Sequence, residues 1–193
     1  MTKNDIKQIQ ETLSIIIGQP MRGLGRFNSE IYFNFGELVE LDMSKVDEAI
    51  REVYEKDDKS VKIMVGEYQL YILCAMRFTH GDKIIFADGD VYYPIDEIEN
   101  EPDFIWDNFK WHETGNNIFD EITARHFKGK YDDYIVKSTK VNNFGDLTIS
   151  FENGYVMELF ADGSDYGENW IFGKTKSTPE ESLILTGRGI YTE

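Results

Sequence analysis

Hydrophobic and polar residues alternate most regularly in the stretch from Gly145 to Lys174. Apolar side chains occupy every second position at its start: Leu147, Ile149 and Phe151. A spacing of two is typical of a β-strand with one buried and one exposed face. Asn153-Gly154 follows, and this dipeptide is a strong signal for a tight turn between two strands. The pattern therefore predicts a β-hairpin.

Two registers of this hairpin can be drawn, and they differ in which residues of the returning strand face the core. A two-residue loop, Asn153-Gly154, would bury the carboxylate of Glu158. A three-residue loop that begins at Glu152 instead continues the apolar face with Tyr155, Met157 and Leu159. Such a loop needs a positive φ at its third position, which glycine adopts without strain. We therefore predict the three-residue loop, with a positive φ at Gly154.

An earlier part of the chain resembles this hairpin. Its matching apolar positions are Ile31, Phe33 and Phe35 in one strand, and Tyr68, Leu70, Ile72 and Cys74 in the next. Met76-Arg77-Phe78 then occupies the position that Trp170-Ile171-Phe172 has in the later copy. The main difference is an insertion between residues 37 and 66, which replaces the tight turn. Either the chain contains an internal duplication, of residues 20–90 and 133–175, or two half-buried strands merely share the same alternation.

The other elements complete an α+β pattern. Asp5 is expected to cap a helix that runs to about residue 17, and further helices are expected at about 44–56 and 117–126. The last of these would turn Ile118, Ile122 and Phe127 inward. Strands are expected at about 61–65, 67–78, 83–88 and 133–141, while residues 182–185 fit a helical turn, which we prefer, or a strand.

Together these elements predict a single α+β domain over residues 1–193, rich in antiparallel strands and flanked by a few helices. The two meander-like halves would then share one core. Its expected members are Ile31, Phe33, Phe35, Leu70, Ile72, Leu147, Ile149, Phe151, Met157 and Leu159.

Charge narrows the range of partners. The formal net charge of −16 argues against nucleic acid and against an anionic membrane, both of which need a basic surface. It suits a basic protein partner, although acidity that only keeps a protein soluble is the commoner explanation. The charged N-terminus offers no apolar core for a signal peptide, and Cys74 is a single cysteine. We therefore expect a cytoplasmic protein.

Residues 96–121 concentrate this charge. They contain nine acidic residues and one lysine, a net of −8, together with several large aromatic residues. A linker that only solvates the chain would lack these aromatics. We therefore propose candidate partner-binding residues in this segment: Glu99, Glu101, Asp103, Trp106 and Trp111. The competing interpretation is that the tryptophans belong to the core and the acids only solubilise the chain.

Catalytic and metal signatures are weak. His80, His112 and His126 lack a second ligand at metal-binding spacing, so we expect no metal, cofactor or catalytic residue. Two acidic glycine loops, Asp88-Gly89-Asp90 and Asp162-Gly163-Ser164-Asp165, are best interpreted as turns. The alternative function is an enzyme, or a ligand- or metal-binding protein, that uses carboxylates clustered from these loops.

One resemblance covers about the C-terminal third. The run from Gly145 to Phe160, with Glu168-Asn169-Trp170, resembles a pattern in small, mostly uncharacterised bacterial proteins. Some of these are similar to immunity proteins of polymorphic toxin systems. The resemblance implies an immunity protein that masks a toxin, and the acidity of the chain suggests that such a toxin is basic; the resemblance carries no functional residues over. We therefore expect a protein-binding module with a basic partner, of unknown oligomeric state.

Overall fold

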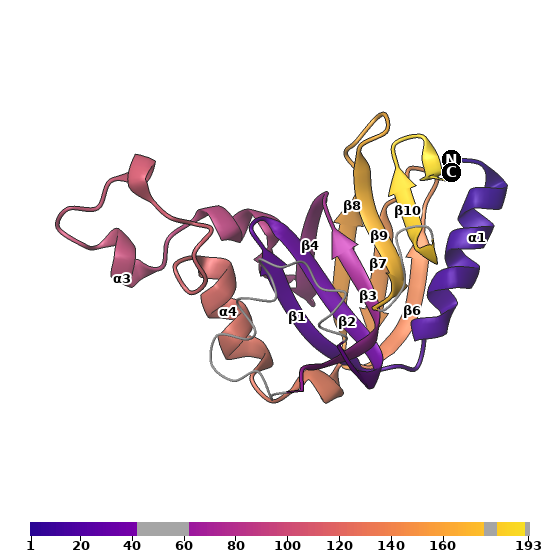
Figure 1. The fold of residues 1–193 in the computed structure, drawn as a ribbon, viewed down its shortest axis with the longest axis horizontal. Coiled ribbons are helices and arrows are strands. Elements are labelled where there is room, and N and C mark those ends of the chain that lie inside the picture. The colour runs from indigo at the N-terminus through magenta and orange to yellow at the C-terminus, as the bar shows by residue number, and fades with distance from the viewer. Residues whose placement is uncertain (42–61, 176–180, 192–193) are drawn as a thin grey trace.

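A computed structural model describes residues 1–41, 62–175 and 181–191, and in this part the chain is an α+β fold built on antiparallel sheets (Figure 1). The six-stranded sheet has the order β1 (Met21–Phe27), β2 (Glu30–Glu40), β3 (Met64–Ile72), β9 (Glu168–Lys174), β10 (Leu183–Thr186) and β11 (Gly189–Tyr191). The five-stranded sheet has the order β5 (Lys83–Ala87), β4 (Ala75–His80), β8 (Tyr155–Phe160), β7 (Leu147–Phe151) and β6 (Val136–Val141). The expected helix at about 44–56 lies outside the described residues.

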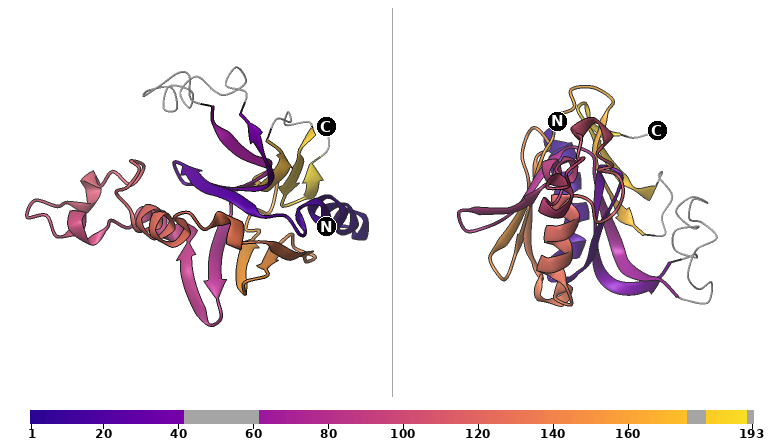
Figure 2. Two further views of the ribbon diagram at one scale, coloured as in Figure 1. Left: turned by 90° about the horizontal axis from the view of Figure 1, so that it is seen from below. Right: turned by 90° about the vertical axis from the view of Figure 1, so that its left-hand side faces the viewer.

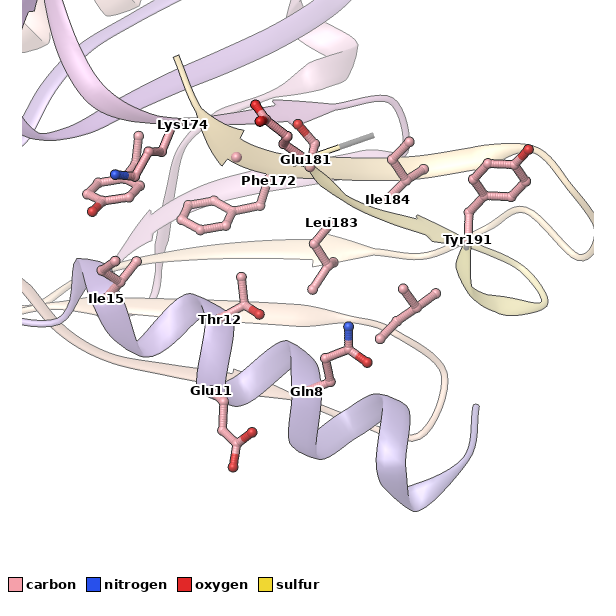
Figure 3. A pocket seen from close by; sticks show the side chains of 14 residues that line it. Gln8, Glu11, Thr12, Ile15, Phe172, Lys174, Glu181, Leu183, Ile184 and Tyr191 are labelled. Carbon is pink, nitrogen blue, oxygen red and sulfur yellow. The ribbon is translucent and has the colours of Figure 1, made fainter. Parts of the chain in front are cut away.

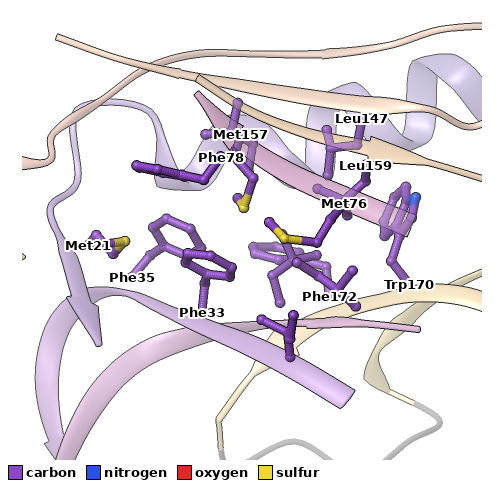
Figure 4. Packing of buried hydrophobic residues seen from close by; sticks show 14 of the residues in the cluster. Met21, Phe33, Phe35, Met76, Phe78, Leu147, Met157, Leu159, Trp170 and Phe172 are labelled. Carbon is purple, nitrogen blue, oxygen red and sulfur yellow. The ribbon is translucent and has the colours of Figure 1, made fainter. Parts of the chain in front are cut away.

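The two sheets pack face to face on one hydrophobic core (Figure 4). All ten residues expected in the core are buried, which confirms that part of the prediction. Phe78 lies near the centre and contacts the rings of Phe33 and Phe151 from opposite sheets. Trp170 is fully buried, and its indole Nε1 donates to the carbonyl of Gly145 at 3.0 Å. The alternation of apolar residues therefore identified the inner face of both sheets.

The hairpin has the predicted register. Ile149 pairs with Met157, and Leu147 pairs with Leu159. The loop holds three residues, and Gly154 has a φ of 87°. Its amide donates to the carbonyl of Phe151 at 3.1 Å. A slip of one residue would have turned this apolar row toward solvent.

Helices close the open sides of the sandwich. α1 (Lys3–Leu13) packs beside β6 and buries Ile9 and Leu13. The sequence suggested Asp5 as the N-cap, but the N-cap is Thr2. Asp5 lies three residues further on and completes a capping box with Thr2. α4 (Ile118–Phe127) packs beside β5, and Figure 2 shows it standing between the two sheets at the opposite side.

The buried face of α4 was predicted correctly at Phe127, and one position too early at Ile118 and Ile122, which are partly buried. Phe119, Thr123 and Phe127 are the buried residues. The reason is that the ring of Phe119 packs on Phe86 of β5, with centroids 5.4 Å apart.

Two strand predictions also need correction. Residues 67–78 were expected to form one strand, but β3 ends at Ile72 and β4 begins at Ala75, because the chain crosses between sheets there. Residues 183–186 form β10 and not the preferred helical turn. Burial of all four β10 side chains against neighbouring strands outweighs the local helical signal.

The two halves of the chain follow the same topology. In the first, β1, β2 and β3 lie in the six-stranded sheet and β4 and β5 in the other; in the second, β6, β7 and β8 lie in the five-stranded sheet and β9 and β10 in the other. Registers agree as well: Phe33 pairs with Leu70 as Ile149 pairs with Met157. This arrangement is what a duplication would produce, and the duplication itself stays a prediction.

Candidate functional site

An excursion of the chain joins the two halves. The amide of Ile118 donates to the carbonyl of Tyr93 at 2.9 Å, and the amide of Ile95 donates to Asn116 at 3.1 Å. The chain therefore returns to the point it left, and residues 94–117 are not needed to connect β5 with α4. We call residues 94–117 the acidic arm. It extends away from the sheets on the side opposite α1 (Figure 1).

A buried ion pair holds the base of the arm. The guanidinium of Arg26 in β1 binds the carboxylate of Asp120 in α4 through two contacts, Nε–Oδ1 at 2.7 Å and Nη2–Oδ2 at 2.6 Å. Only 4% of the Arg26 side chain is exposed. Asp120 Oδ2 also accepts from the amide of Gly115, and Arg26 donates to the carbonyl of Glu113. These contacts orient the arm relative to β1.

Asn117 completes the attachment. Its side chain is fully buried, and its Oδ1 caps α4 by accepting from the amide of Asp120 at 2.9 Å. Its Nδ2 donates to the carbonyl of Trp111 at 2.8 Å. In the sequence, Asp120 stands out only as one of the nine acidic residues between positions 96 and 121. The capping position of Asn117 before α4 was the signal that could have located the base.

The arm carries carboxylates that no described cation neutralises. It contains seven acidic residues and one lysine, and Lys110 pairs with Glu113 at 3.0 Å. Within the described part of the chain, the other six acids form no ion pair. These are Asp96, Glu97, Glu99, Glu101, Asp103 and Asp107, and all six are exposed.

Apolar side chains are exposed beside these carboxylates. Trp106 is 51% exposed and Ile105 is 57% exposed. The indole of Trp106 contacts the rings of Phe104, Phe109 and Tyr93, with centroids 5.5 to 6.3 Å apart. The arm thus has a small aromatic cluster of its own, which holds Trp106 at the surface.

The five candidate residues are not all alike. Glu99, Glu101, Asp103 and Trp106 lie exposed on the arm. Glu101 and Asp103 line one shallow hollow of about 250 Å³, together with Phe104 and Phe109. Glu99 does not line this hollow. Trp111 is different, because it is partly buried, packs against the core and touches the ring of Tyr92 at 5.2 Å. The surface candidates are therefore the first four.

The structure also brings together residues that sequence reasoning kept apart. His126 Nε2 lies 2.9 Å from the hydroxyl of Tyr134, and His80 stacks on Tyr155 with ring centroids 4.3 Å apart. Burial is the main cause that lowers the pKa of His126, and Lys130 and His80 add to it. Within the described residues, no three His, Cys, Asp or Glu side chains are grouped as a metal site requires.

The acidic glycine loops have structural roles. Asp88 accepts from the amide of Met76 at 2.7 Å, and Asp90 accepts from the amide of Ala87 at 2.9 Å. Asp165 pairs with Arg188 at 2.6 Å. Cys74 is buried nearby, and burial raises the pKa of its thiol to about 12, with the charges of Asp162 and Asp88 adding to the effect. A thiol in this state is a poor nucleophile.

Comparison with protein-family models, with curated proteins and with solved structures found no match. None of the helices in the described ranges combines the length and the apolar character that crossing a bilayer requires.

Proposed function

We propose that this chain is a non-enzymatic protein-binding module whose acidic arm captures a basic protein. The observation that carries the proposal is the arm itself. The topology does not require it, a buried ion pair anchors it, and it presents six unneutralised carboxylates beside an exposed tryptophan. An aromatic anchor surrounded by complementary charge is the usual arrangement of a tight interface.

Charge and aromatic surface would act at different stages of binding. The carboxylates attract a basic partner before contact, over a range of about 8 Å at physiological salt. Trp106 then supplies apolar area at the centre of the contact, where desolvation slows dissociation. Salt should therefore slow association more than it speeds dissociation.

In its most specific form, the proposal is that the partner is a toxin and that this chain is an immunity protein, which masks the toxin in the cytoplasm. The resemblance of the Gly145–Phe160 run to such proteins supports this form. A toxin gene next to the gene for this chain would support it independently.

The alternative of clustered catalytic or metal-binding carboxylates ranks lower. Asp88 and Asp90 already accept hydrogen bonds from backbone amides. Asp165 is paired with Arg188.

The test is a pull-down from the native organism with three forms of the protein. The arm variant carries Glu99→Gln, Glu101→Gln and Asp103→Asn. The control variant, Glu30→Gln, Glu37→Gln and Asp82→Asn, removes the same charge from exposed positions outside the arm. The proposal expects a basic protein that the wild type and the control recover and the arm variant loses. Recovery of the same proteins by all three forms would refute it.

A further inference from the structure

The acidic arm contains the shallow hollow of about 250 Å³ that Glu101 and Asp103 line, and we call it the arm hollow. Its apolar lining comes from four side chains of the arm: Ile98, Phe104, Ile105 and Phe109. None of these four residues is buried, and Ile105 is 57% exposed. A group of a partner can therefore reach this lining without unfolding any part of the arm.

A larger hollow, of about 700 Å³, lies between α1 and strands β9 and β10 (Figure 3). The aromatic rings that line it are closed to a ligand. Tyr68 and Phe172 are only 8% and 2% exposed, and the ammonium of Lys174 lies 6.0 Å from the centroid of the Tyr68 ring. The arm hollow is smaller, but its rings are accessible.

Two phenyl rings lie next to each other in the arm hollow. The centroids of Phe104 and Phe109 are 6.2 Å apart, with 59° between the ring planes. Elsewhere in the fold, three aromatic rings each have an arginine or a lysine over them. In the described part of the chain, no such cation lies over Phe104 or Phe109. Because the face of an aromatic ring attracts a cation, these two rings suit a cation from a partner.

Carboxylates line the same hollow. Glu101 and Asp103 are exposed, and neither forms an ion pair among the described residues. Lys110 also lines the hollow, but its ammonium is paired with Glu113 at 3.0 Å. Two negative charges beside apolar rings are complementary to an organic cation and unfavourable for an anion.

Size and chemistry both favour a single arginine side chain as this cation. A volume of about 250 Å³ is below the roughly 300 Å³ at which small-molecule sites begin. A guanidinium is planar, stacks on aromatic rings and donates several N–H groups to carboxylates. It is also more weakly hydrated than an ammonium, so less hydration is lost when it enters an apolar hollow. A lysine would supply the charge without the flat, forked donor.

We propose that the arm hollow receives one arginine side chain of the captured protein. Its guanidinium lies on the rings of Phe104 and Phe109 and donates to the carboxylates of Glu101 and Asp103. The inference rests on the proposed function and deepens it, because it names the group of the basic partner that the arm recognises. The six unneutralised carboxylates attract any basic protein, whereas the hollow selects one that presents an arginine.

The test is an NMR titration of the isotope-labelled protein with a blocked tripeptide, glycyl-arginyl-glycine. Saturable shifts are expected at Phe104, Phe109 and Asn108, which line the hollow. The same tripeptide with lysine should bind roughly two- to fivefold more weakly, which is the size of an exposed cation–π contact. Citrulline has nearly the shape of arginine without its charge, and the citrulline tripeptide should bind roughly tenfold more weakly or less.

Two matched charge variants locate the binding. The hollow variant, Glu101→Gln with Asp103→Asn, should weaken binding of the arginine tripeptide roughly tenfold. The control variant, Glu99→Gln with Asp107→Asn, removes the same charge from exposed positions of the arm that do not line the hollow. It should bind within about twofold of the wild type, because exposed charges at a distance are screened by salt. Phe104→Leu keeps the lining apolar and should abolish the preference for arginine over lysine.

The inference is overturned if the arginine tripeptide gives no saturable shifts, or if the lysine or citrulline tripeptide binds as tightly. It is equally overturned if the control variant loses as much binding as the hollow variant. The pull-down reports separately on the proposed function. A basic protein that only the arm variant loses, without any preference for arginine, refutes the role of the hollow and leaves the function of the arm standing. Arginine binding without a captured basic protein supports the selectivity of the hollow and refutes the proposed function.

Discussion

Replacing Arg26 by alanine should destabilise the fold strongly. The substitution leaves the carboxylate of Asp120 without its cation in a site where only 12% of that side chain is exposed. It removes both contacts of the bidentate pair and also the bond to the carbonyl of Glu113. Breaking a buried ion pair from one side typically costs about 3–5 kcal/mol, because an uncompensated charge remains.

Chemical denaturation measures this cost directly. We expect the free energy of unfolding to fall by about 3–5 kcal/mol, and the melting temperature to fall by roughly 6–20 °C for a domain of this size. Arg77→Ala is the matched control, because its pair with Glu158 has side chains 41% and 28% exposed. An exposed pair of this kind contributes at most about 1 kcal/mol.

A double-mutant cycle separates the pair from its surroundings. Asp120→Asn alone should also destabilise, and the combined Arg26→Ala, Asp120→Asn variant should cost less than the two single effects added together. If Arg26→Ala costs no more than Arg77→Ala, the pair does not anchor the arm and the reasoning about its base is wrong.

Three further outcomes are expected. Gly154→Ala should cost about 1–2 kcal/mol in denaturation, since an alanine at a φ of 87° is strained, and a neutral effect would contradict the loop assignment. The Cys74 thiol should react slowly with a thiol reagent until the protein unfolds, because burial raises its pKa to about 12; fast labelling of the native protein would contradict its burial. The pKa of His126 is lowered from 6.5, so the unfolded chain takes up the proton first, and stability should fall as the pH drops below about 6.5 and through the folded pKa. His126→Gln should reduce this loss in unfolding experiments at neutral and acidic pH, and an unchanged pH dependence would count against the shift.

The strands could be predicted because one physical rule dominates them. With one face of each sheet buried, the alternation of Leu147, Ile149 and Phe151 left a single register that keeps the core apolar. The similarity of Ile31–Phe35 to this strand also pointed to matching registers in the two halves. What the pattern could not show is that each half contributes strands to both sheets, because local alternation carries no information about which sheet a strand joins.

The helix caps and the site were harder to predict, because they too depend on contacts that the local sequence does not show. Asp5 and Thr2 are both good caps, and only the capping-box geometry decides between them. The acidic arm was visible as charge with aromatics, but its anchor depends on Arg26 and Asp120, which lie 94 positions apart. The same applies to Trp106 and Trp111, whose different exposure follows from tertiary packing.

Removing the arm tests the central claim most directly. Replacing residues 96–110 with a short Gly/Ser linker deletes Trp106 and the six unneutralised carboxylates, and retains the hydrogen bond between Ile118 and Tyr93. It also keeps the contacts of Arg26 with residues 113 and 120. This variant should therefore stay folded.

The measurement is the association rate with the basic protein that the wild type recovers, at low and at high salt. The wild type should associate rapidly at low salt and more slowly at high salt, and the variant without the arm should show no measurable binding at either. A folded variant that associates as fast as the wild type, with the same salt dependence, would contradict the claim that the acidic arm captures the partner.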